Sequence, residues 1–173
     1  MQASQEKRET IPFDHKPHIL IIEARFYPEI ADHLADGATA VITMSGGTFE
    51  RVTVPGSLEI PGVIAIAEQA KRAGTLQRPY DGYIALGCVI RGATNHYDIV
   101  CNESARGLMD LSLDYGCAIG NGILTCDNME QAIERARADQ MDKGGHAAYA
   151  ALKMVHLRTR MGLNDRQPAC CAA

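Results

Sequence analysis

Short apolar runs alternate along this chain with longer segments in which apolar residues recur every three or four positions. The first run, HILIIEA at 18–24, is typical of a strand that is buried on both faces. Further runs at 49–54, 83–88 and 118–125 predict three more strands. The helical spacing between the runs predicts helices over 29–45, 58–73, 97–115, 129–138 and 146–161, with a break at 142–145.

This alternation of strands and helices predicts the architecture. Four strand–helix repeats favour a four-stranded parallel sheet with right-handed crossovers and helices on both faces. We therefore expect an α/β protein, built as a three-layer α/β/α sandwich of the flavodoxin-like kind. We expect a single domain over residues 17–161, with a flexible N-terminal arm at 1–16 and a flexible C-terminal tail at 162–173.

Composition narrows the class of function. Hydrophobic residues make up 46% of the 173 residues, and the formal net charge is −4. An acidic chain without a basic stripe argues against nucleic acid as a partner. No apolar run has the length of a membrane span, and the polar N-terminal segment lacks the apolar centre of a secretory signal. We therefore expect no membrane partner and a cytoplasmic location.

Metal and nucleotide motifs are absent from the sequence. The six cysteines form no CxxC pair, and neither they nor the histidines have the spacing of zinc ligands. The chain has no GxGxxG and no GxxxxGK[ST] motif. We therefore expect no metal and no cofactor, and we expect the cysteines to be reduced thiols.

The segment GCVIRGATNHYDIVC, residues 87–101, carries the clearest chemical signal. A strand that ends in glycine and leads into a helix presents free backbone N–H groups, which attract a phosphate. His96 lies beside these groups and can exchange protons near neutral pH, although it could equally be a surface residue at a helix start. Arg91 could serve the phosphate or form an ion pair.

Other candidates follow the remaining strands, because ligands bind beyond the carboxyl ends of parallel strands. Phe26 could stack on a flat heterocycle or simply pack, and backbone groups of 57–59 could hold a polyol or only begin a helix. Arg135 and Lys143 could reach a phosphate or a carbonyl. The charged residues around Arg135 favour a solvated, ion-paired helix face.

Several of these stretches together resemble the lumazine synthase family. The matching segments are ARFY (24–27), VPGSLEIP (54–61), ALGCVIRGATNHYDIVCNES (85–104), NGILTCDNMEQA (121–132) and DKGGHAAYAAL (142–152). The resemblance implies an enzyme that condenses 5-amino-6-(D-ribitylamino)uracil with 3,4-dihydroxy-2-butanone 4-phosphate. The products are 6,7-dimethyl-8-ribityllumazine, phosphate and water, in the penultimate step of riboflavin biosynthesis, and the family needs no metal or redox cofactor.

The resemblance also implies a role for each matching residue. His96 would transfer protons, and Arg135 would hold the butanone phosphate. Lys143 would approach the pyrimidine carbonyl or help to orient the helix pair. The family's remaining substrate-binding positions correspond to Phe26, Ser57, Leu58, Glu59, Cys88, Val89, Ile90, Ala93, Thr94 and Asn121. Of these, Ala93 and Thr94 would share the phosphate with Arg135.

Two positions depart from the commoner family pattern. Leu58 stands where many members have an aromatic residue, and Asn121 stands where many have a bulky apolar one. These departures leave open a weakly active paralogue that binds a flavin or lumazine as a carrier or assembly protein. A flavodoxin-like FMN module is disfavoured, because the position of its phosphate loop holds ARFYPEI here.

The resemblance further implies self-association. Members of the family form their site between neighbouring subunits of a homopentamer, and some stack such rings into a larger shell. Asn121 would then belong to the neighbour's contribution.

Overall fold

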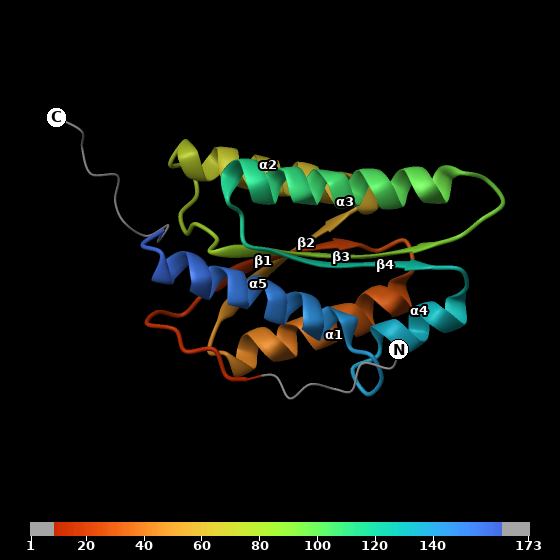
Figure 1. Ribbon diagram of the computed structural model, residues 1–173, viewed down its shortest axis with the longest axis horizontal. Coiled ribbons are helices and arrows are strands. Elements are labelled where there is room, and N and C mark those ends of the chain that lie inside the picture. The colour runs from red at the N-terminus through yellow and green to blue at the C-terminus, as the bar shows by residue number, and fades with distance from the viewer. Residues whose placement is uncertain (1–8, 164–173) are drawn as a thin grey trace.

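The computed structural model describes residues 9–163 and contains a four-stranded, all-parallel sheet (Figure 1). The strand order is β2-β1-β3-β4, so β2 and β4 are the edge strands. The strands are β1 (His18–Ala24), β2 (Thr48–Val54), β3 (Gly82–Ile90) and β4 (Ile119–Cys126). All four predicted strands are confirmed, although β3 runs two residues further toward the site than we predicted.

Helices cover both faces of the sheet, which confirms the predicted three-layer α/β/α sandwich (Figure 1). One layer contains α1 (Pro28–Met44), α4 (Met129–Ala136) and α5 (Lys143–Arg160). The other layer contains α2 (Ile60–Arg72), which follows the 3-10 turn η1 (Ser57–Glu59), and α3 (His96–Tyr115). None of the helices within residues 9–163 is long and apolar enough to cross a membrane.

The uninterrupted apolar run of β1 follows from this layering. Every residue of His18–Ala24 is buried, and alternate side chains enter different cores. Ile19 and Ile21 pack with α1 and α5, whereas Leu20 and Ile22 pack with α2. A strand that is covered on both faces needs apolar residues at consecutive positions, because successive side chains point to opposite faces.

The start of α5 corrects the prediction for 142–145. We expected a break there, but α5 begins at Lys143, and the Asp142 carboxylate accepts a hydrogen bond from the Gly145 amide at 3.1 Å. Gly144 lies against the backbone of Leu34 in α1, where a Cβ would clash with the Leu34 carbonyl. Gly144 therefore permits close helix packing, and neither Gly144 nor Gly145 ends a helix. The preceding α4 ends at Ala136, two residues before the predicted end.

The chain ahead of β1 packs on the domain from at least residue 11. Ile11 is 4% exposed, and the Phe13 ring makes an edge contact with His156 of α5, with centroids 6.0 Å apart. This part of the expected arm is therefore attached to the core. Residues 1–8 and 164–173 lie outside the described part of the chain, so the flexible arm and tail and the domain limits at 17 and 161 stay predictions.

Candidate functional site

The carboxyl ends of β1, β2 and β3 meet at one edge of the sheet and surround a pocket of about 520 Å³, which we call the main pocket. Its walls come from the segments that follow these strands and from the first turn of α3. The following site residues expected from the sequence line it: Phe26, Ser57, Leu58, Glu59, Cys88, Val89, Ile90, Thr94 and His96. Positions that are distant in the sequence thus meet at one cavity.

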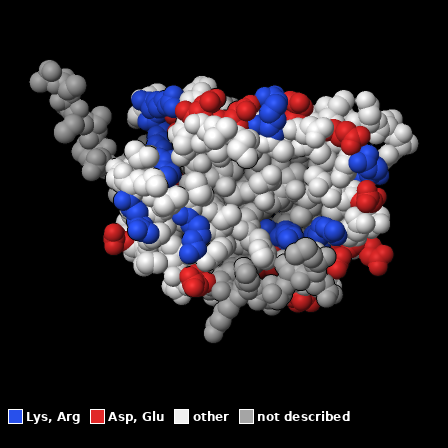
Figure 2. All heavy atoms as spheres, in the orientation of Figure 1, with Lys and Arg blue, Asp and Glu red and all other residues white. Residues whose placement is uncertain are grey.

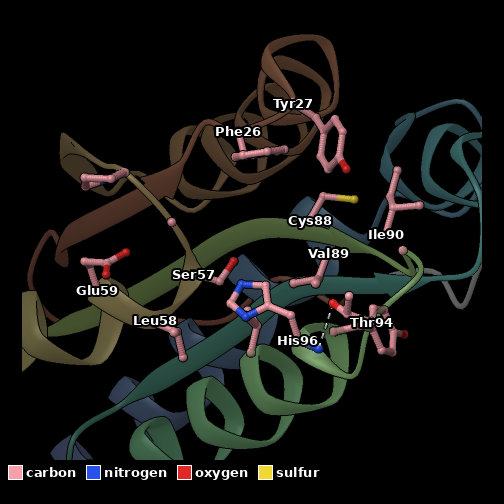
Figure 3. A pocket seen from close by; sticks show the side chains of 15 residues that line it. Phe26, Tyr27, Ser57, Leu58, Glu59, Cys88, Val89, Ile90, Thr94 and His96 are labelled. Carbon is pink, nitrogen blue, oxygen red and sulfur yellow. Dashed lines mark hydrogen bonds between the residues drawn. The ribbon is translucent and has the colours of Figure 1, made fainter.

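Aromatic side chains form one side of the main pocket. Phe26 and Tyr27 lie on this side, and Leu58 and His96 lie on the opposite side (Figure 3). The Phe26 ring is 72% exposed and contacts Tyr27 edge-on, with centroids 5.0 Å apart. An exposed aromatic face at the rim of a pocket can stack on a flat heterocycle.

The floor of the pocket depends on a close approach between η1 and β3. Ser57 is 6% exposed, and a Cβ on Gly87 would lie 2.7 Å from the Ser57 Oγ. Only glycine at position 87 leaves room for Ser57 at this place. The backbone of η1 is thereby held beside Cys88 and Val89 at the end of β3.

His96 is the first residue of α3 and is exposed at the pocket. Its backbone N–H lies 3.4 Å from the Thr94 Oγ1, which can accept a hydrogen bond from it. Asp98 is the acidic residue in the first turn, where the positive end of the helix dipole favours negative charge. The same helix end suits a bound anion, and the His96 imidazole lies beside it.

A second hollow of about 410 Å³, which we call the β4 hollow, lies along the edge strand β4 and the helices α4 and α5. It contains three further predicted residues, Asn121, Arg135 and Lys143. The Arg135 Nη1 donates a hydrogen bond to the Gln131 carbonyl at 3.0 Å. None of the described residues that line this hollow is acidic, so it favours an anionic ligand.

The predicted phosphate ligands are not together in one chain. Thr94 lines the main pocket, Arg135 lines the β4 hollow, and Ala93 lines neither. Arg91, for which two roles were open, pairs with the Asp98 carboxylate, with the Nη2 and Oδ1 atoms 3.1 Å apart.

Several lining residues escaped the sequence analysis. Tyr27, Tyr97 and Val100 line the main pocket, and His146 lines the β4 hollow. Val100 follows His96 by four positions, which places both on one face of α3. Helical spacing from His96 could therefore have identified Val100, whereas Tyr27 carried no signal beyond its position next to Phe26.

Burial makes the pocket thiol a poor nucleophile. Burial, with a smaller contribution from the neighbouring Cys126, raises the pKa of Cys88 to about 12. Burial likewise raises the pKa values of Cys101 and Cys126. The thiols therefore stay protonated near neutral pH, and Cys88 serves the pocket as a small apolar surface. Among residues 9–163, no group of three His, Cys, Asp or Glu side chains could hold a metal ion.

A parallel α/β sandwich with an aromatic-rimmed pocket and a helix N-terminus at the carboxyl edge of its sheet is typical of proteins that bind a small molecule beyond the ends of their strands. The family model for 6,7-dimethyl-8-ribityllumazine synthase matches residues 16–159. The chain therefore belongs to the 6,7-dimethyl-8-ribityllumazine synthase family, and it is an enzyme, a transferase of riboflavin biosynthesis.

Curated relatives agree with this assignment. The chain is 54% identical over 149 residues to a 6,7-dimethyl-8-ribityllumazine synthase of Bartonella tribocorum, an alignment that covers 86% of this chain and 95% of the relative. It is 55% identical over 145 residues to 6,7-dimethyl-8-ribityllumazine synthase 1 of Rhizobium meliloti, covering 84% and 94%. A synthase of Agrobacterium fabrum is 53% identical over 148 residues, covering 85% and 98%.

Proposed function

We propose that this chain condenses 5-amino-6-(D-ribitylamino)uracil with 3,4-dihydroxy-2-butanone 4-phosphate, with the main pocket as the place of reaction. The observation that carries the proposal is the meeting of Phe26, the η1 turn, the end of β3 and His96 around one cavity. These are the positions for which the family resemblance implies contacts with both substrates. Family membership supports the same reaction.

The uracil would occupy the aromatic side of the pocket. The exposed Phe26 ring supplies a face for stacking, and residues 88–90 at the end of β3 supply groups for the ring edge. The ribityl chain would lie along η1, where residues 57–59 offer backbone groups and the Glu59 carboxylate to its hydroxyls. Leu58, in place of an aromatic residue, would contribute apolar contact without ring stacking.

The butanone phosphate would bind at the start of α3. Backbone N–H groups around Ala93 and Thr94 and the helix N-terminus favour the dianion. In the reaction, the uracil amine attacks the ketone and forms an imine with loss of water, and phosphate then leaves. Ring closure on the remaining carbonyl expels a second water. His96, beside the phosphate, would carry protons during imine formation and elimination.

We further propose that Asn121, Arg135 and Lys143 complete the site of a neighbouring subunit in a homopentamer. Two features support this proposal: these residues line a hollow separate from His96, and β4 is an open edge of the sheet. Figure 2 shows a broad uncharged area in the upper middle of this face, and basic groups at the border of the hollow just below it. Arg135 of one subunit would then stabilise the leaving phosphate on its neighbour.

The cytoplasm is the proposed location, because Cys88, Cys101, Cys117 and Cys126 are free thiols, as is usual in a reducing compartment. No observation favours the alternative of a carrier paralogue, since the relatives above are all named as synthases.

The proposal is tested by mixing both substrates with the purified protein and following the absorbance and fluorescence of the lumazine product. We expect saturable product formation well above the uncatalysed background, and a loss of about a hundredfold or more in kcat for His96→Ala. A wild-type protein that gives only the background rate with both substrates would refute the proposed reaction.

A further inference from the structure

The loop that joins β3 to α3, residues 91–95, carries part of the main pocket but has little support of its own. All of its residues are exposed, and Asn95 makes no side-chain capping bond to α3. Thr94 within the loop and His96 after it both line the pocket. An exposed loop gains little from apolar burial, so its shape depends on a small number of polar contacts.

Arg91 supplies several of these contacts, three through its side chain and one through its backbone. Its guanidinium carbon lies 4.0 Å from the centroid of the Tyr97 ring, a cation–π distance. Its Nη2 lies 3.1 Å from the Asp98 Oδ1, and its Nε lies 3.6 Å from the Asp127 Oδ1. Its backbone N–H donates to the Cys126 carbonyl at 2.9 Å. Arg91 thus joins both ends of the loop to each other and to the end of β4.

We infer that Arg91 is a positioning residue, which holds the loop in the shape that places Thr94 and His96 at the substrate phosphate; this inference rests on the proposed function. The guanidinium itself does not line the main pocket. Its charge is matched by the carboxylates of Asp98 and Asp127, and one of its faces is covered by the Tyr97 ring. It therefore acts through the loop and does not bind the phosphate.

The contacts continue from Arg91 to the β4 hollow. Asp127, which pairs with Arg91, donates its backbone N–H to the Gln131 Oε1 at 3.0 Å. The Gln131 backbone carbonyl in turn accepts the hydrogen bond from the Arg135 guanidinium. Arg91 thereby connects the main pocket to the segment that orients Arg135. Because rate depends steeply on the alignment of reacting groups, a small displacement of this segment is costly for turnover.

The test is steady-state kinetics with both substrates on Arg91→Ala, Arg91→Lys and Asp98→Asn. For Arg91→Ala we expect KM for the butanone phosphate to rise about tenfold and kcat to fall about tenfold, with KM for the uracil changed less than about twofold. Arg91→Lys keeps the charge but loses the planar fork, so it should show a smaller loss of the same kind.

Arg106→Ala is the matched control. Arg106 lies in the same helix as Asp98 and is also an exposed arginine with two acidic partners, but these partners, Glu103 and Asp110, both lie within α3 and not beside the loop. We expect its kinetic constants to stay within about twofold of the wild type, because its pairs are ordinary surface ion pairs.

Asp98→Asn separates positioning from direct phosphate binding. If Arg91 holds the loop, loss of the Asp98 charge loosens it, and KM for the butanone phosphate rises. If Arg91 bound the phosphate, the same change would release the guanidinium, and KM would fall. A falling KM in Asp98→Asn, or an Arg91→Ala protein indistinguishable from Arg106→Ala, overturns the inference. Each of these outcomes can be measured only if the wild-type protein is active. A wild-type protein that is no faster than the uncatalysed reaction would instead refute the proposed function.

Discussion

Subunits that each lack one half of the site should restore each other's activity. His96 lines the main pocket, whereas Arg135 lines the β4 hollow. If every site combines the main pocket of one subunit with the β4 hollow of the next, His96→Ala and Arg135→Ala damage different halves. A mixed ring then contains sites in which both halves are intact, although no subunit in it is intact.

The size of the recovery follows from this geometry. In a random equimolar ring, half of the main pockets keep His96 and half of the adjoining β4 hollows keep Arg135. About a quarter of the sites therefore keep both residues, so the mixture should recover about a quarter of the wild-type kcat. Each variant alone should be at least about tenfold below that level, since proton transfer and arginine stabilisation typically contribute about a hundredfold or more.

The assay co-expresses the two variants with different affinity tags, purifies rings that carry both tags, and measures lumazine formation. A matched control pairs His96→Ala with the double variant His96→Ala/Arg135→Ala, in which no intact site can form. Activity in the doubly tagged rings no higher than the mean of the two parents would show that His96 and Arg135 do not act across a subunit boundary.

Three further predictions concern the framework of the site. Gly87→Val should lower the free energy of unfolding by about 1–3 kcal/mol and raise KM for the uracil, because its side chain displaces Ser57; a denaturant titration and kinetics check this, and an unchanged KM contradicts it. Asp142→Ala removes the cap of α5 and should cost about 1 kcal/mol in the same titration, and a midpoint equal to that of the wild type would contradict this. Burial, opposed by the weaker attraction of Glu50, lowers the pKa of His18, so the folded state resists protonation. The contribution of His18 to stability should therefore be full above about pH 6.5 and fall as the pH drops below it. In His18→Gln, the thermal melting midpoint should change less between about pH 7 and 5.5 than it does in the wild type, and an equally steep change in both proteins would refute this.

Local patterns were sufficient for most of the framework. The run at 18–24 predicted a strand covered on both faces, and each of its residues is buried. The rule that ligands lie beyond the carboxyl ends of parallel strands placed Phe26, Ser57 and His96 near one another, and they line one pocket.

The start of α5 shows where local patterns fail. Two consecutive glycines, 144 and 145, are unfavourable inside a helix and predicted a break. They lie instead in the first turn of α5, where Gly144 meets the Leu34 backbone of α1 so closely that no larger residue fits. A contact between elements more than a hundred positions apart outweighed the local preference, and no local window contains that information.

The sequence by itself determined the order and type of the elements, the parallel sheet and the residues that follow its strands. Hydrophobic periodicity is a local property, and a helix between successive strands implies that those strands run parallel. Only the tertiary structure decided that Arg135 and Lys143 lie in a separate hollow on the β4 edge, and that Arg91 joins Tyr97, Asp98 and Asp127. These arrangements depend on how strands and helices pack in space. The physical reason is that spacing along the sequence does not specify which face of the sheet a later helix will cover.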